Sequence, residues 1–269
     1  MANAPRGARY GKVAASRRDT DRLQKPLEIP PGCEALLVLQ RTQYQSALRR
    51  LLRKIGRGDF YDRHLAGIVD SWRHARIERL YEAELTPEFA RRLPPLPAAP
   101  RHVLDIGCGL AGIDAWIYHA CGKPALCLLD REGRSEVYYG FRADAAFYNS
   151  LALARRLLEM NGVPAGQITT VDVDTQPLPR NRRFDLVISL LSWGFHYPLD
   201  TYLHYVKAQL TDDGAVIVDT RRDTGGYDTL IDQFDQVTVV EETPKLQRLK
   251  VVGARRDAQD SISPTSSSG

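Results

Sequence analysis

Glycines follow an acidic residue and an apolar run between residues 103 and 112, which read Val-Leu-Asp-Ile-Gly-Cys-Gly-Leu-Ala-Gly. Gly107, Gly109 and Gly112 can adopt backbone angles closed to other residues, so the chain can turn sharply from a strand into a helix. Such a turn presents main-chain N–H groups at the helix N-terminus, where side chains would block a ligand. The pattern predicts a nucleotide site, and alone it does not separate NAD from other adenosine ligands.

Acidic residues also close the next apolar runs. Asp130 ends the run 125–129, at about the distance from the glycines where an acidic residue accepts hydrogen bonds from ribose hydroxyls. A third run, 168–173, ends in Asp174, and a fourth is Phe-Asp-Leu-Val-Ile-Ser at 184–189. The length and composition of these runs predict buried strands.

These motifs, in this order and at these spacings, resemble the class I S-adenosylmethionine (SAM) dependent methyltransferases. The resemblance rests on Asp-x-Gly-x-Gly-x-x-Gly, the acidic end of the second strand, Asp-x-x-x-Leu-Pro and Phe-Asp-Leu-Val-Ile-Ser, and it covers roughly residues 100 to 254. It implies SAM as the cofactor. It also implies a Rossmann-like α/β fold with a seven-stranded, mostly parallel sheet whose last strand is antiparallel. The remaining strands are expected at 215–219, 237–242 and 248–252, with a helix at 201–210 and a turn at 212–214.

The resemblance further implies a role for each motif residue. Asp105 would lie near the methionine ammonium, and Asp130 would hold the ribose diol. Asp174 and the Thr175 N–H would contact adenine, with Asp172 as an alternative partner. The implied cofactor residues are Asp105, Gly107, Cys108, Gly109, Gly112, Asp130, Asp174, Thr175, Ser189 and Leu190, the last two through backbone carbonyls at the methyl end. A lone aspartate in such a place can equally be a helix cap or turn residue, and four motifs in register favour the cofactor role.

The loop at 191–200, Leu-Ser-Trp-Gly-Phe-His-Tyr-Pro-Leu-Asp, follows the fourth strand. Ligands of open α/β sheets bind beyond the carboxyl ends of the strands, so Trp193 and Tyr197 are predicted to contact the acceptor. His196 is the predicted catalytic base, because an unperturbed imidazole has a pKa of about 6.5. A packing or capping role for this histidine stays open, since positioning alone can accelerate methyl transfer from a sulfonium.

An insertion at 131–149 is longer than an ordinary connection and carries Tyr138 and Tyr139. We expect these tyrosines to form part of a lid over the acceptor. Together with the loop at 191–200, the insertion resembles bacterial sugar O-methyltransferases. The alternative is an aromatic cluster that packs on the N-terminal helices.

Charge divides the chain. Residues 1–92 carry 19 Lys and Arg against 11 Asp and Glu, whereas the remainder has an acidic excess. We expect a flexible basic tail at 1–26, a helical cap with a proline-rich link at 27–97, a SAM-binding domain at 98–254 and a disordered tail at 255–269. Within the cap, helices are predicted at 33–55 and 59–85, the second with an apolar face made of Tyr61, Leu65, Ile68, Val69, Trp72 and Leu80.

The first of these helices is basic, through Arg49, Arg50, Arg53, Lys54 and Arg57. These cations form either a solvated face or a surface for a phosphorylated or nucleic-acid substrate. The four cysteines, Cys33, Cys108, Cys121 and Cys127, have no C-x-x-C or metal-ligand spacing. No metal site and no membrane span are expected, and the predicted location is the cytoplasm.

The sequence therefore predicts a SAM-dependent methyltransferase that O-methylates a small-molecule or glycan acceptor. Asn/Asp-Pro-Pro-Tyr/Phe, the signature for methylating exocyclic amines of bases, is missing, and the fourth-strand loop has no cysteine for a covalent pyrimidine mechanism. An RNA methyltransferase that uses the basic helix is the first alternative, and a non-catalytic methyltransferase-like subunit is the second. An NAD-dependent dehydrogenase comes last. The oligomeric state is left open.

Overall fold

The computed structural model describes residues 25–60, 64–97, 99–134 and 148–255. The tails predicted at 1–26 and 255–269 lie almost wholly outside these ranges, as do Tyr138 and Tyr139 of the predicted lid.

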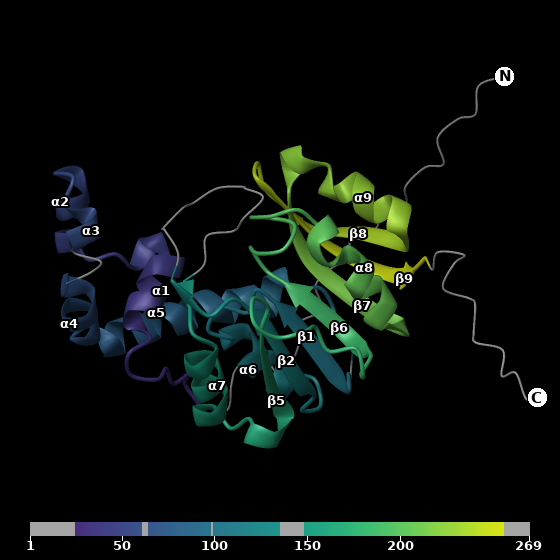
Figure 1. Cartoon of the computed structure of the whole chain (residues 1–269), viewed down its shortest axis with the longest axis horizontal. Helices are drawn as coiled ribbons and strands as arrows, with labels where there is room; N and C mark the ends of the chain where they lie inside the picture. Colours follow the sequence, from purple (N-terminus) through teal and green to yellow (C-terminus); the bar gives the residue numbers. More distant parts are fainter. Residues whose placement is uncertain (1–24, 61–63, 98, 135–147, 256–269) are drawn as a thin grey trace, which may run out of the picture.

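A seven-stranded sheet forms the centre of the molecule, in the order β5-β2-β1-β6-β7-β9-β8 (Figure 1). Its strands are β1 (His102–Ile106), β2 (Ala125–Asp130), β5 (Ile168–Asp172), β6 (Phe184–Ser189), β7 (Leu210–Arg221), β8 (Phe234–Glu242) and β9 (Leu246–Ala254). Strands β5, β2, β1, β6 and β7 pair in parallel, and β9 runs antiparallel to both of its neighbours. The predicted fold class, including the antiparallel last strand, is confirmed.

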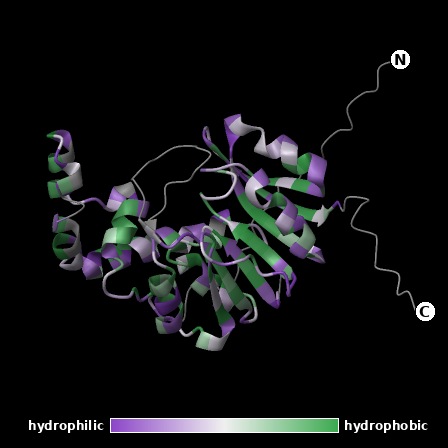
Figure 2. Ribbon diagram, viewed as in Figure 1, coloured by the Kyte–Doolittle hydropathy of each residue, from purple (hydrophilic) through white to green (hydrophobic). Residues whose placement is uncertain are grey.

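Helices cover both faces of this sheet. Alternate strand residues point to opposite faces, so Val103 packs in one apolar cluster and Leu104 in the other. The helices α6 (Gly112–Ala120) and α7 (Leu151–Met160) belong to the first cluster. On the other face lie α8 (Asp200–Gln209) and α9 (Gly226–Gln233). Figure 2 shows the apolar strands between these layers.

Two details of the connections differ from expectation. Residues 212–214, predicted as a turn, lie within β7, where the pairing with β6 moves from Leu210 to Ala215 and leaves the residues between them outside the ladder. The ends of the insertion at 131–149 pair as a two-stranded ribbon of β3 (Gly133–Arg134) and β4 (Tyr148–Asn149).

The N-terminal segment is helical but far more broken than predicted. It contains α1 (Glu34–Gln40), α2 (Ala47–Lys54), α3 (Gly58–Phe60), α4 (Ala66–Ser71), α5 (His74–Pro87) and a π-helical turn at Glu88–Arg92. Short 3₁₀ turns occur at Thr42–Tyr44, Ala165–Gln167 and Arg222–Thr224.

Hydrogen bonds to α5 explain the break in the first predicted helix. The side chains of Arg41, Gln43 and Tyr44 all donate to Glu84, at 2.9, 2.8 and 2.6 Å. The backbone of Arg41 is extended where the continuous helix was expected. Tertiary contacts to one carboxylate therefore override the local helical pattern.

The apolar face predicted for 59–85 is wrong. Ile68 and Trp72 are exposed, whereas α5 buries Ile77, Tyr81 and Leu85. The predicted face assumes one continuous helix, but a turn at residues 72–73 separates α4 from α5. This break changes the direction of every later side chain relative to the predicted face. The true face of α5 joins the cluster that contains α6 and the sheet, so the N-terminal helices and the sheet share one core.

Candidate active site

A cavity of about 570 Å³ opens at the carboxyl ends of β1, β2 and β6, where ligands of open α/β sheets bind. Nine of the predicted site residues line it: Asp105, Gly107, Cys108, Gly109, Gly112, Asp130, Leu190, His196 and Tyr197. The remaining wall comes from α1, α5 and the start of α8.

The glycine loop is fastened to β2. The N–H of Gly107 donates to the Leu129 carbonyl at 2.7 Å, and the N–H of Gly109 donates to Asp130 at 2.9 Å. Gly107 has a φ of +76°, and a Cβ there would lie 1.8 Å from the Ser192 hydroxyl. Only glycine fits this position, because both the backbone angle and the close approach of the β6 loop forbid a side chain.

Gly112 is required for a different reason from the one predicted. Its N–H donates to the phenol oxygen of Tyr81 at 3.1 Å, and a Cβ there would lie 2.3 Å from that oxygen. Burial raises the pKa of Tyr81 to about 12, so the phenol keeps its proton. Because Gly112 has no side chain, Tyr81 of α5 can pack against the N-terminus of α6. The Gly112 N–H already donates to Tyr81, so it is not available to a ligand.

Asp130 is the main acceptor for the loops around the cavity. Besides Gly109, it accepts hydrogen bonds from the side chain of Asn149 at 2.9 Å and from the N–H of Arg131 at 2.8 Å. Burial raises its pKa to about 6, and these three donors act in the opposite direction. Each carboxylate oxygen has two lone pairs, so the group can accept further hydrogen bonds from a ligand.

Asp105 lies beside a second buried carboxyl group, that of Asp114 on α6. The two side chains are 4% and 1% exposed, and they lie close enough for each to influence the pKa of the other. In the described part of the chain, no hydrogen-bond donor reaches either Asp114 oxygen, so two ionised carboxylates would repel each other here and a proton on one of them relieves the repulsion. Burial and the neighbouring carboxylates raise the pKa of Asp105 well above its usual value, and burial raises that of Asp114 to about 7.

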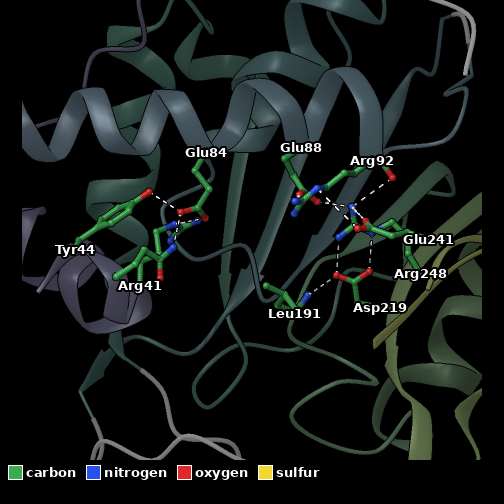
Figure 3. Close-up of polar contacts among 10 residues, drawn as sticks. Arg41, Tyr44, Glu84, Glu88, Arg92, Leu191, Asp219, Glu241 and Arg248 are labelled. Atoms are coloured by element: carbon green, nitrogen blue, oxygen red, sulfur yellow. Dashed lines mark hydrogen bonds and ion pairs between the residues drawn. The ribbon is translucent and has the colours of Figure 1, made fainter. Parts of the chain in front are cut away.

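The wall on the α1 and α5 side is polar. Its side chains are Gln40, Arg41, Gln43, Glu84, Glu88 and Arg92. Glu84 receives the donors from Arg41 and Tyr44 (Figure 3), and the Arg41 guanidinium lies 4.5 Å from the centre of the Tyr81 ring. Sequence reasoning missed this wall. The only available signal was the short polar run from Gln40 to Gln43 inside an apolar pattern.

A buried ion pair between Asp219 and Arg248 supports the loop after β6. The N–H of Leu191, which has a φ of +54°, donates to Asp219 at 3.0 Å. Asp219 also accepts two hydrogen bonds from Arg248, at 2.7 and 2.8 Å, and Arg248 reaches Glu88 as well (Figure 3). The network thus connects β7, β9 and the π-helical turn to the chain segment that lines the cavity.

Residues of this loop divide between core and cavity. Trp193, predicted to contact the acceptor, is fully buried and donates its indole N–H to the Leu199 carbonyl at 2.8 Å, so it supports the loop instead. Ser189 is also fully buried; its hydroxyl donates to the Ile106 carbonyl and accepts from the Trp193 N–H. Tyr197 and His196 do line the cavity, and burial raises the pKa of Tyr197.

The predicted adenine partners lie outside the cavity wall. Asp174 is half exposed and pairs with Arg131 at 3.2 Å. The Thr175 hydroxyl donates to the Asp172 carboxylate at 2.8 Å, and the Thr175 N–H donates to the Asp172 backbone carbonyl at 3.2 Å. The hydrogen bond from the hydroxyl is the main reason why the pKa of Asp172 is lowered. Neither residue is among those that line the cavity, whereas the preceding Val173 is.

Two further properties bear on the site. In the described ranges, no group of three or more His, Cys, Asp or Glu side chains could hold a metal ion. No helix in these ranges is both long and apolar enough to span a bilayer.

Comparisons with known proteins find similarity only at the level of the fold. No family model and no curated protein matches the sequence. Among solved structures, the chain is similar to a precorrin-6y methyltransferase from Geobacter metallireducens, at 16% identity over 66% of this chain and 89% of that one, with a TM-score of 0.42. A 16S rRNA methyltransferase from T. thermophilus is 14% identical over 65% of this chain and 41% of that one, with a TM-score of 0.41. A tRNA methyltransferase from B. subtilis is 15% identical over 63% of this chain and 67% of that one, with a TM-score of 0.41. At these values the similarities identify neither a substrate nor a cofactor of this chain.

The carboxyl pair predicts how stability changes with pH. Because folding raises both pKa values above about 4, the folded protein binds protons more tightly than the unfolded chain. The free energy of unfolding should therefore fall as the pH rises through about 7. Asp114→Asn removes one charge and lets an amide donate to Asp105. We expect the variant to be about 1 to 3 kcal/mol more stable than the wild type at pH 8, with a smaller difference at pH 5.

Urea unfolding at a series of pH values measures this effect. Asp213→Asn, at an exposed carboxylate of β7, is the matched control and should change stability by less than about 0.5 kcal/mol. If Asp114→Asn left the pH dependence of the unfolding free energy unchanged, the shared-proton interpretation would be wrong.

Proposed function

We propose that the protein is a SAM-dependent methyltransferase that transfers a methyl group to an oxygen atom of a small molecule or sugar-containing acceptor. The observation that carries this proposal is the combination of the fastened glycine loop with two acidic groups, the buried Asp105 and the partly buried Asp130, at the carboxyl ends of neighbouring strands. The cavity volume lies within the range of about 300 to 1,000 Å³ that is usual for ligand sites.

The residues present fit such a cofactor. No cationic side chain of the described residues pairs with Asp105 or Asp114, and an ammonium group near Asp105 would stabilise the ionised form. Gly107 and Gly109 line the cavity with backbone that carries no side chain, and Asp130 has lone pairs for the ribose hydroxyls. When bound, SAM supplies an electrophilic methyl group on a sulfonium.

A polyhydroxyl acceptor suits the rest of the cavity. The α1 and α5 wall offers amide, carboxylate and guanidinium groups, and Thr201 and Tyr202 add hydroxyl-bearing side chains from α8. Sites for apolar acceptors are lined mainly by apolar and aromatic side chains. The polarity of this wall therefore favours a sugar-containing or otherwise hydroxylated acceptor.

In the proposed reaction, the acceptor oxygen attacks the methyl carbon as the carbon–sulfur bond breaks. The hydroxyl proton passes to His196, which lines the cavity in the loop after β6. Neutral imidazole is needed to accept it. Leu190 and Tyr197 in the same loop contribute to holding the reactants in line.

An RNA acceptor is less favoured. Arg49, one of the predicted cations, is 1% exposed. The helix that carries it, α2, lies at one end of the molecule (Figure 1), and none of its residues lines the cavity. The side chain of Arg53 lies outside the described residues. A non-catalytic role fits less well with an open cavity at an intact glycine loop. We also propose a cytoplasmic location, because the four cysteines are buried thiols that form no disulfide in the described part of the chain.

Cofactor binding tests the first part of the proposal. Calorimetry should show binding of SAM or its demethylated product, S-adenosylhomocysteine, and no binding of NAD. Gly107→Arg should abolish binding because a side chain there collides with Ser192 and displaces the loops that line the cavity, and Asp130→Ala should weaken it by about 1 to 3 kcal/mol. Asp174→Ala is the matched control and should leave affinity unchanged, because Asp174 lies outside the cavity wall. Full affinity in both Gly107→Arg and Asp130→Ala would reject this site.

The role of His196 is tested separately, with an acceptor found by screening sugars and other hydroxylated compounds. His196→Ala should lower kcat by about 10²- to 10⁴-fold and leave S-adenosylhomocysteine affinity unchanged. The acidic limb of the pH–rate profile should also disappear. His204→Ala, at an exposed histidine of α8, is the control. A decrease in kcat of less than about threefold would make His196 structural.

A further inference from the structure

Exposed apolar side chains gather on the N-terminal arm, which we define as the described residues between Ala47 and Trp72. Six of the nine large apolar side chains that are exposed in the described part of the chain lie here: Leu48, Leu51, Ile55, Phe60, Ile68 and Trp72. The exposed fraction reaches 84% at Trp72. A soluble surface of scattered apolar residues does not concentrate them in this way.

The helical spacing places these side chains on faces. Leu48, Leu51 and Ile55 are three and four residues apart on α2 and at its end, so they line one side of the helix. Ile68 and Trp72 are likewise four residues apart, at α4 and its C-terminus. Figure 2 shows that hydrophobic and hydrophilic residues alternate around these helices. The arm is therefore amphipathic, with its apolar faces turned to solvent.

Cations accompany the apolar side chains. Arg50, Lys54 and Arg57 are exposed, and no acidic residue occurs from Arg41 to Arg57. Residues 1–25 of the sequence carry a further excess of Lys and Arg over Asp and Glu. Any partner of this surface must accept positive charge and apolar groups together.

The arm is separate from the cavity. Figure 1 shows α2, α3 and α4 together at one end of the molecule, with α1 and α5 between them and the sheet. No residue from 47 to 72 is among those that line the cavity. The patch therefore needs an explanation other than cofactor or acceptor binding.

We propose that the N-terminal arm docks on anionic membrane surfaces. A bilayer interface accepts Leu, Ile and Trp side chains into its headgroup and acyl boundary, and anionic headgroups attract Arg and Lys. RNA offers phosphates but no apolar phase for Leu51 and Ile55. A second copy of the chain would cover the apolar face but would bring its own cations against these cations. This inference does not rest on the proposed methyl transfer.

Trp72 provides the measurement. The chain has three tryptophans, and the other two, Trp116 and Trp193, are 3% and 0% exposed. A shift of emission to shorter wavelength therefore reports Trp72. The full-length protein should show this shift, and should sediment with vesicles, when phosphatidylglycerol makes up about a third of the phosphatidylcholine membrane. Pure phosphatidylcholine vesicles should give a far smaller effect, and added salt should weaken binding.

Variants separate the contributions. Leu51→Ser combined with Ile55→Ser should weaken vesicle binding by about tenfold or more, because both side chains are over half exposed in solution and buried at the interface. Ile231→Ser, at an exposed apolar residue of α9, is the matched control and should bind like the wild type. Since these sites are exposed, the variants should fold, which circular dichroism checks.

Three outcomes would overturn the proposal. The first is no emission shift and no sedimentation with anionic vesicles. The second is tight binding of RNA by the arm with no vesicle binding, which would assign the surface to nucleic acid. The third is a dimer that Leu51→Ser and Ile55→Ser convert to a monomer, again with no vesicle binding, which would assign it to a second copy.

Discussion

The carboxylate of Asp130 is the interaction on which the rest of the site depends. It ties the glycine loop after β1, the first residue after β2 and the end of β4 through Gly109, Arg131 and Asn149. With these segments fixed, the carboxyl ends of β1 and β2 enclose a cavity whose floor is acidic. The cost of burying this charge is reduced by three hydrogen bonds, and the remainder appears as a raised pKa. A cationic ligand is the natural complement of such a floor.

The N-terminal helices complete the site as well as covering the sheet. Tyr81 takes the first N–H of α6, Gln40 lies beside Gly109, and Glu88 reaches the buried Asp219–Arg248 pair that supports the loop after β6. These contacts join residues far apart in the sequence to the glycine loop and to the loop that carries His196. The acidic side of the cavity comes from the sheet, and the polar side opposite comes largely from α1, α5 and the turns that follow these helices.

The sheet could be predicted from the sequence because its strands contain short apolar runs, and β1, β2 and β5 end at a glycine or an acidic residue. The breaks in the helices before it could not, because Glu84 makes tertiary contacts that end the helical pattern at Arg41. Within the site, a motif locates a residue without saying what its side chain touches. Trp193 and Gly112 both fall in motifs. Trp193 is nevertheless buried in the core, and Gly112 packs against Tyr81. Asp114 carried no signal, since only the fold places it beside Asp105.

We propose that the ammonium group of the cofactor binds near Asp105. Proton release on ligand binding is the most direct test of this contact. Calorimetry near pH 6 in buffers with different heats of ionisation counts the protons released. S-adenosylhomocysteine, which carries the amino-acid group, should release up to about one proton per protein, because its ammonium favours the ionised carboxyl pair. 5′-Methylthioadenosine, which lacks that group, should release fewer protons, because only the contact of its ribose with Asp130 remains. Equal proton release by the two ligands would show that the ammonium group does not bind near Asp105.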